Sequence, residues 1–185
     1  MPLLIAHLNP DTKIIGVELQ KELADHARQN VIDNSFEHRI QIIHENICNV
    51  SPTRTKGLVD IVISNPPYMK KGQGRLNANE QKALARHEIS LDIKTVCQRA
   101  HDLLRKTGDI YIIFPFQRQK DLIDTLEACG FHSVSILRIH GTEDKPPIRI
   151  LIHAKKKMQS KSILKPPIYL QDSLRAHPKT VLPGF

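Results

Sequence analysis

The chain has 185 residues, and its 27 lysines and arginines exceed its 19 aspartates and glutamates, which gives a formal net charge of +8. A hydrophobic fraction of 40% with 25% charged residues is typical of a folded globular protein and excludes a disordered chain. No uninterrupted apolar run approaches the roughly 20 residues of a membrane span. Cys48, Cys97 and Cys129 are scattered, which excludes a disulfide scaffold and a structural zinc site and favours a reducing, cytoplasmic location.

The first half of the chain alternates between helical and strand-like patterns. Residues 2–8 are apolar and typical of the end of a helix. A β-branched run at residues 14–18 predicts a buried parallel strand, and the apolar spacing of residues 20–30 predicts a helix after it. Apolar runs at residues 40–43 and 58–63 predict two further strands.

The second half continues the alternation. In chain order we expect a long helix over residues 80–105 that ends at Gly108, a strand at 110–114, a helix at 117–129, and strands at 134–139 and 148–153. This order predicts an α/β fold with a mostly parallel sheet. The short connection between the last two strands predicts an antiparallel hairpin at one edge.

The turn Asn65-Pro66-Pro67-Tyr68 lies at the end of a predicted buried strand, where open α/β sheets bind their ligands. The prolines fix the backbone and remove two donors, so the Asn65 side-chain oxygen and the Pro66 carbonyl can accept from one amino group. Tyr68 offers a flat face on which a base can stack. The turn predicts a site that positions an exocyclic amine for methyl transfer, and the alternative is a rigid turn whose tyrosine covers the sheet edge.

Two polar residues follow the first two predicted strands. Glu18 can accept hydrogen bonds from both ribose hydroxyls of a nucleoside cofactor. Its alternative role is that of an acid at a helix N-terminus, where the helix dipole favours it. Asn46 is placed to meet the adenine edge of the cofactor, and its alternative role is that of a plain turn residue.

The basic balance favours a polyanionic partner, because each neutralised phosphate releases counterions. Lys70, Lys71 and Arg75 flank the predicted site and are candidates for holding RNA phosphates. The lysines between residues 155 and 165 are more typical of a solvated tail. No metal-ligand spacing is present, so the sequence predicts no metal.

These residues carry a family resemblance. The chain resembles the class I S-adenosylmethionine-dependent methyltransferases that modify amino groups. The resemblance lies in the order of three features: Gly16-Val17-Glu18, then Asn46, then the turn Asn65-Pro66-Pro67-Tyr68. Three further stretches resemble one family within this class, the bacterial tRNA(Val) adenine N6-methyltransferases. They are Ala85-Arg86-His87-Glu88, Leu103-Leu104…Gly108 and Pro166-Pro167-Ile168-Tyr169. That family methylates the adenine next to the anticodon.

The resemblance implies a role for each matching residue. Glu18 would bind the ribose of S-adenosylmethionine, and Asn46 would lie at the cofactor adenine, where the family more often has an aspartate. Asn65 would accept from the target amine beside the cofactor, with Pro66 helping through its carbonyl. Pro67 would stiffen the turn, and Tyr68 would stack on the base.

The resemblance also implies a Rossmann-like fold, with a partial methyltransferase domain over residues 1–157 and a basic, proline-rich tail over residues 158–185. The family opens with a strand and a glycine-rich loop, and no Gly-x-Gly occurs before Glu18. We therefore expect a chain that is truncated at the N-terminus and lacks both features.

The expected function is methyl transfer from S-adenosylmethionine to the N6 amine of adenine in tRNA. A DNA adenine or protein glutamine N-methyltransferase would use the same turn, because each of these enzymes also methylates an amino group. An inactive RNA-binding fragment would use the basic residues without the cofactor. A dinucleotide-dependent enzyme would use Glu18, but it would need a glycine fingerprint that the chain lacks.

Overall fold

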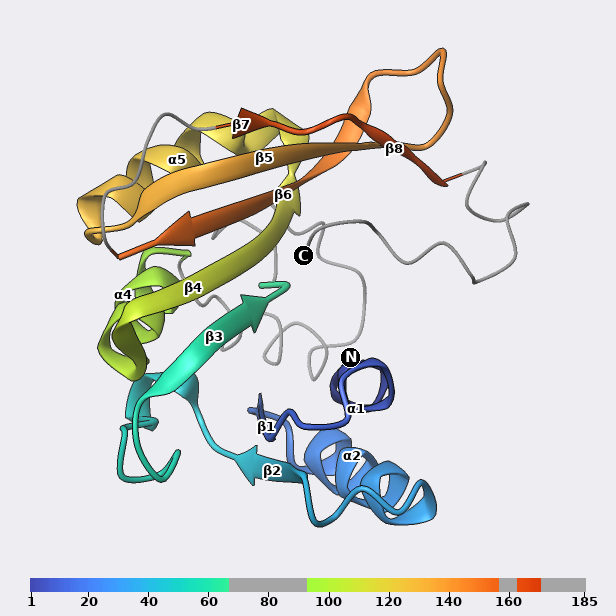
Figure 1. The fold of residues 1–185 in the computed structure, drawn as a ribbon, viewed down its shortest axis with the longest axis vertical. Helices are drawn as coiled ribbons and strands as arrows, with labels where there is room; N and C mark the ends of the chain where they lie inside the picture. Colours follow the sequence, from blue (N-terminus) through green and yellow to red (C-terminus); the bar gives the residue numbers. More distant parts are fainter. Residues whose placement is uncertain (67–92, 157–162, 171–185) are drawn as a thin grey trace, which may run out of the picture. The chain divides into compact units, whose positions relative to one another are not determined.

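The structure is a computed structural model that describes residues 1–66, 93–156 and 163–170 (Figure 1). The chain divides into two compact units, Met1–Leu58 and Val59–Phe185, which we call unit 1 and unit 2. In the described ranges, none of the helices has the length and apolar character needed to cross a bilayer. The expected domain boundary at residue 157 stays a prediction.

Unit 1 is a small parallel α/β motif. Its elements are α1 (Pro2–Leu8), β1 (Ile14–Glu18), α2 (Lys21–Asp33), β2 (Ile40–His44) and the 3₁₀ helix η1 (Ile47–Asn49). β1 pairs with β2 in parallel, from Ile14 opposite Ile40 to Glu18 opposite His44. The two strands therefore end side by side, as the sequence predicts.

A small apolar core and one arginine hold unit 1 together. Ala6, Val31 and Ile40 are buried, one each from α1, α2 and β2. Arg39 donates to the carbonyls of Ala6, Asn9 and Pro10, at 2.8, 3.0 and 2.6 Å. Because the last carbonyls of a helix lack intrahelical donors, Arg39 caps α1 and ties it to the start of β2.

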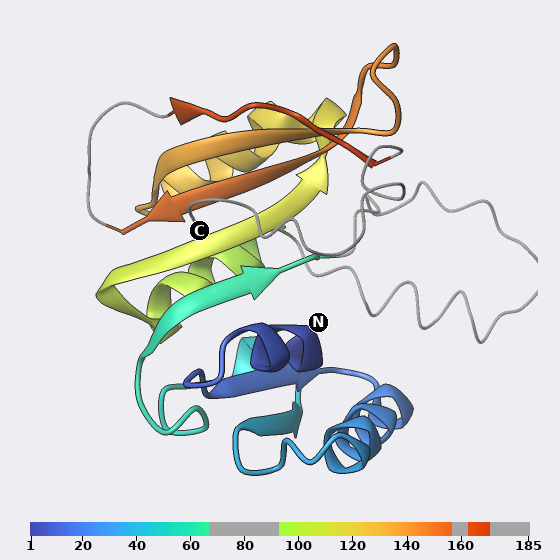
Figure 2. The same ribbon diagram turned by 45° about the vertical axis from the view of Figure 1, so that its right-hand side comes forward.

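Unit 2 contains a larger sheet. Its elements are β3 (Val59–Ser64), α4 (Ile93–Leu103), β4 (Leu104–Pro115), the 3₁₀ helix η2 (Phe116–Arg118), α5 (Gln119–Ala128), β5 (His132–His140), β6 (Pro147–Lys155), β7 (Ile163–Leu164) and β8 (Ile168–Tyr169). The strand order is β3-β4-β6-β5-β7, and β8 also pairs with β5. β3 is parallel to β4, whereas β6 is antiparallel to both of its neighbours (Figure 2).

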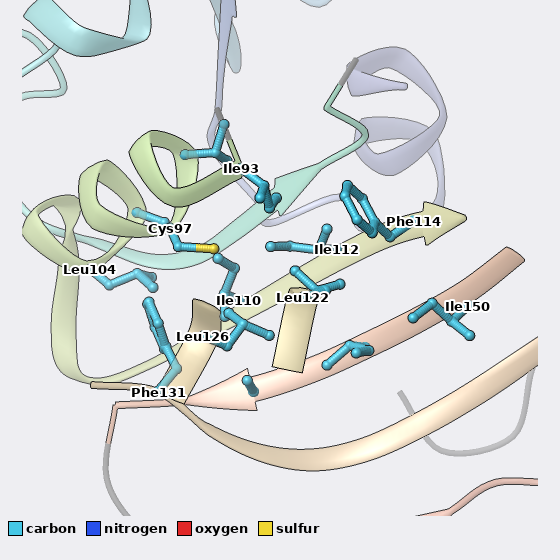
Figure 3. Close-up of a cluster of buried hydrophobic side chains, with 14 residues drawn as sticks. Ile93, Cys97, Leu104, Ile110, Ile112, Phe114, Leu122, Leu126, Phe131 and Ile150 are labelled. Carbon is cyan, nitrogen blue, oxygen red and sulfur yellow. The ribbon is translucent and has the colours of Figure 1, made fainter. Parts of the chain in front are cut away.

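The core of unit 2 lies between this sheet and the helices α4 and α5 (Figure 3). Alternate residues of β4 (Ile110, Ile112 and Phe114) point to the helices and are at most 1% exposed. Leu122 and Leu126 of α5 occupy the same core and are fully buried. This alternation is the period of a strand that is covered on one face, and it fixes the register of β4.

The structure corrects the sequence prediction around Gly108. The expected helix over residues 80–105 ends earlier, at Leu103, and β4 begins at Leu104, opposite Val59 of β3. Gly108 is thus a buried residue within β4, and it does not end a helix. Residues 80–92 of the expected helix lie outside the described residues. Pairing with β3 outweighs the local helix preference of residues 104–106.

The predicted antiparallel hairpin is present as β5 and β6, but it is not the outer edge of the sheet. β7 and β8 pair in parallel with β5, through Ser135 opposite Ile163 and Ile139 opposite Ile168. Both short strands come from the segment that the sequence assigns to the tail. Strands of two residues carry too little periodicity to be predicted from sequence.

Gly108→Ala tests the close packing of β3 against β4. An added Cβ would lie 2.8 Å from Leu104 Cδ2, 3.0 Å from the Arg105 carbonyl and 3.1 Å from the Asp60 carbonyl. We expect the variant to lose about 1–3 kcal/mol of unfolding free energy. Urea denaturation followed by tyrosine fluorescence measures this in unit 2, because Tyr68, Tyr111 and Tyr169 all belong to that unit.

Gly141→Ala is the matched control, because a Cβ there meets nothing within 4 Å. It should leave the urea midpoint within experimental error of the parent. Equal midpoints for the Gly108 and Gly141 variants would contradict the described packing.

Candidate functional site

Asn65 and Pro66 lie just beyond the carboxyl end of β3 in unit 2. β3 runs parallel to β4 with Ser64 opposite Ile112, so both strands end at the same edge of the sheet. Asn65 is exposed and Pro66 is buried. A proline disfavours the helical conformation for the residue before it and donates no backbone hydrogen bond, which explains why the strand ends here.

The other residues of the predicted turn and its basic flank lie outside the described residues. These are Pro67, Tyr68, Lys70, Lys71 and Arg75. The structure therefore describes the amide and the first proline of the predicted amine site, and the proposed stacking and phosphate contacts of the rest stay predictions.

Glu18 and Asn46 come together in unit 1. The carboxyl ends of β1 and β2 are adjacent, and the Glu45 amide donates to the Glu18 carbonyl at 3.0 Å. Glu18 is half-buried, and its Oε1 accepts from the Gln20 amide at 2.9 Å, at the start of α2. The alternative role of Glu18 at a helix N-terminus is therefore observed. The ribose contact stays a prediction, and the two roles are compatible because a carboxylate can accept several hydrogen bonds.

Asn46 caps the short helix η1. Its Oδ1 accepts from the Cys48 amide at 2.9 Å, while its backbone amide donates to Glu45 Oε1 at 3.1 Å. The Asn49 side chain also donates to Glu45, and these hydrogen bonds, with a smaller contribution from Arg54, lower the pKa of the Glu45 carboxyl. The loop after β2 is thus held in place by its own side chains, which keeps Asn46 at the carboxyl edge beside Glu18.

Three arginines that the sequence does not single out gather at the carboxyl edge of the sheet in unit 2. Arg118 follows β4 directly, Arg149 lies opposite Pro115 at the end of β4, and Arg138 lies opposite Ile150. β5 is parallel to β4, so the edge that carries Asn65 also carries these guanidinium groups. They share no common signal in the sequence, because Arg118 falls in a predicted helix, Arg138 near the end of a predicted strand and Arg149 at the start of another.

A separate polar cluster lies near the middle of β4 in the same sheet. His153 hydrogen-bonds Asp109, Lys155 Nζ lies 3.3 Å from the same carboxylate, and Tyr111 stacks on the His153 ring with centroids 4.4 Å apart. Burial, with a contribution from Asp109, raises the pKa of Tyr111. The cluster links β4 to β6. Within the described ranges no three metal-binding side chains converge.

Comparison with known proteins places the chain in a family. The family model described as "RMKL-like, methyltransferase domain" matches residues 4–140. The chain belongs to this family of RMKL-like methyltransferase domains. The predicted fold class and enzyme class are confirmed, and so is S-adenosylmethionine as the cofactor of the family.

The relatives carry a narrower name. A protein of Aliivibrio fischeri named tRNA1(Val) (adenine(37)-N6)-methyltransferase is 29% identical over 177 residues, which are 96% of this chain and 70% of the relative. A protein of the same name from Porphyromonas gingivalis is 32% identical over 154 residues, which are 80% of this chain and 58% of the relative. The chain thus spans between about half and three quarters of these relatives' length.

Solved structures show the same fold. A predicted O-methyltransferase of Agrobacterium tumefaciens has a TM-score of 0.67 at 19% identity, covering 91% of this chain and 74% of its own. A Listeria monocytogenes protein described as a class I S-adenosylmethionine-dependent methyltransferase has a TM-score of 0.60 at 13% identity, covering 90% of this chain and 54% of its own. These likenesses establish the class I methyltransferase fold.

Replacing Asn46 separates its capping role from any cofactor contact. Asn46→Ala removes the acceptor of the Cys48 amide, which should cost about 0.5–2 kcal/mol of local stability, whereas Asn46→Asp keeps the acceptor. Hydrogen exchange of the Cys48 amide, followed by NMR, measures this directly. We expect faster exchange in the alanine variant and near-parental exchange in the aspartate variant, and equal exchange in all three proteins would rule out the cap.

Proposed function

We propose that this protein transfers a methyl group from S-adenosylmethionine to the N6 amine of an adenine in tRNA. The observation that carries the proposal is the position of Asn65-Pro66, at the carboxyl end of a strand in a chain of the methyltransferase family. The shared name of the Aliivibrio and Porphyromonas relatives supports tRNA, with adenine 37 as the target. The cytoplasm, where tRNA is modified, is the proposed site of action.

Asn65 is proposed to bind the reacting group. Its amide oxygen accepts from the adenine amine, and the Pro66 carbonyl takes the second amine hydrogen. Two fixed acceptors orient the nitrogen lone pair, so positioning supplies much of the rate. Pro67 stiffens the turn and Tyr68 stacks on the base, worth about 1–3 kcal/mol. Lys70, Lys71 and Arg75 are proposed to contact RNA phosphates beside this turn.

Glu18 and Asn46 are proposed to hold the cofactor, which supplies an electrophilic methyl group when bound. The Glu18 carboxylate fits the ribose, because one oxygen is already oriented by the Gln20 amide and the group can accept further hydrogen bonds. Asn46 uses Oδ1 for its cap, which leaves the side-chain nitrogen as the donor toward the adenine of the cofactor. Both residues are positioned by backbone that is fixed in unit 1.

Asn65→Ala tests the amine site. Losing the acceptor should lower kcat for tRNA methylation about 10²- to 10³-fold, by analogy with the loss of one oriented hydrogen bond in other active sites. The KM for tRNA should change little, since the other RNA contacts remain. Initial rates with a tRNA(Val) transcript and methyl-labelled cofactor measure both values.

Asn30→Ala serves as the control for this experiment, because Asn30 is an exposed residue of α2. Its kcat should equal that of the parent. A fully active Asn65 variant would overturn the proposed role of the turn.

Glu18→Gln tests the ribose contact. Hydrogen bonds to a charged acceptor contribute about 1.5–3 kcal/mol, so the affinity for S-adenosylmethionine should fall about 10- to 100-fold. Equilibrium dialysis of the protein with labelled cofactor measures the affinity. Glu22→Gln, an exposed acid in the first turn of α2, should bind as the parent does. Equal affinities for the two variants would remove Glu18 from the cofactor site.

A further inference from the structure

Arg118, Arg138 and Arg149 lie at one end of the sheet in unit 2. Pro115 is the last residue of β4 and lies opposite Arg149 of β6, which in turn lies opposite Ile139 of β5. Arg118 closes the 3₁₀ helix that follows β4. Figure 3 shows Phe114 near the arrowhead of β4 and Ile150 on the neighbouring strand β6, at the end where the arginines lie.

Aromatic rings hold two of these guanidinium groups. The Cζ atom of Arg118 lies 4.9 Å from the centre of the Phe114 ring, and that of Arg138 lies 5.7 Å from the centre of the Phe116 ring. Such stacking fixes the plane of a guanidinium group while leaving its edge for a planar or tetrahedral anion. Arg118 and Arg138 are therefore oriented before any ligand binds.

The three arginines differ in their partners. Arg118 pairs with Asp121 at 3.2 Å, and that aspartate is 53% exposed. The Nε of Arg138 is buried without a hydrogen-bond partner in the described part of the chain. Arg149 donates from Nη1 to the Ile148 carbonyl at 3.1 Å. A buried guanidinium donor without an acceptor costs free energy, which an anionic ligand would recover.

The start of α5 adds to the positive potential. Arg118 is the N-cap of this helix of 10 residues, and its side chain makes no capping hydrogen bond. The partial positive charge of a helix N-terminus favours anions, although Asp121 in the first turn offsets part of it. Glu143 and Asp144 lie in the turn between β5 and β6, and both are exposed.

The cluster lies on the same edge as Asn65. Neighbouring strands are about 4.8 Å apart, so β6 lies about 10 Å from β3, with β4 between them. Arg138 shares the helix-covered face with Ile150, whereas Arg149 shares the opposite face with Pro115. The arginines thus flank the edge from both faces of the sheet, which suits a chain of phosphates better than a single small anion.

We propose that Arg118, Arg138 and Arg149 bind the phosphate backbone of the RNA substrate and thereby hold the target nucleotide beside Asn65. The proposal rests on the proposed function, because it assigns the substrate of that site. Arginine suits this role, since its planar donors match phosphate oxygens in pairs.

The test measures affinity for a tRNA(Val) transcript by filter binding over a range of salt concentrations. Arg118→Gln and Arg149→Gln should each reduce the slope of log affinity against log salt by about 1, and the double variant by about 2. In methylation assays the same variants should raise the KM for tRNA and leave kcat unchanged. Arg138→Lys keeps the charge and should retain most of the salt slope.

Arg105→Gln is the matched control, because Arg105 lies near the amino end of β4 and pairs with Asp60 at 3.0 Å. It should keep the salt slope and the KM of the parent. Tyrosine fluorescence and cofactor affinity identify variants that fail to fold. A double variant that is folded and has the slope and KM of the parent would overturn the proposal while leaving the methyltransferase function intact. A parent protein that methylates DNA or protein glutamine and not tRNA would overturn the proposed function itself.

Discussion

The parallel pairing of β3 with β4 is the constraint on which the account of unit 2 depends. It sets Ser64 opposite Ile112 and so brings Asn65 to the edge at which β4 also ends. The core beneath holds this register, because Ile110, Ile112 and Phe114 can enter it only from alternate positions of β4. A shift of one residue would expose these side chains. The position of Asn65 is thus set by the burial of residues that have no chemical role.

In unit 1, the backbone that carries the candidate residues is positioned with fewer buried apolar residues. Its buried core is small, and hydrogen bonds do much of the positioning: Arg39 caps α1, Glu18 accepts from the Gln20 amide, and Asn46 caps η1. Glu18 and Asn46 lie at the carboxyl ends of β1 and β2, where the cofactor is proposed to bind, whereas Arg39 lies at the amino end of β2. The side chains at the proposed cofactor edge therefore also fix the backbone that carries them.

Much of the fold could be predicted from sequence, because β1, β2 and β3 are apolar runs with clear ends and α5 has helical spacing. Leu104 could not be assigned correctly, since its strand state depends on pairing with Val59, which is distant in sequence. β7 and β8 take their state from β5 in the same way. Among the candidate site residues, Glu18, Asn46 and Asn65 could be proposed from the ends of predicted strands. Arg138 became a candidate only when the register placed it at the edge of the sheet in unit 2.

The central claim is that this protein transfers a methyl group to an adenine amine of tRNA. The most direct measurement incubates the protein with methyl-labelled S-adenosylmethionine and equal amounts of a tRNA(Val) transcript, a DNA duplex and a glutamine-containing protein, followed by mass spectrometry of the products. The account predicts labelled N6-methyladenosine at position 37 of the tRNA and no label in the other two. Label in DNA or in glutamine, with none in tRNA, would contradict it.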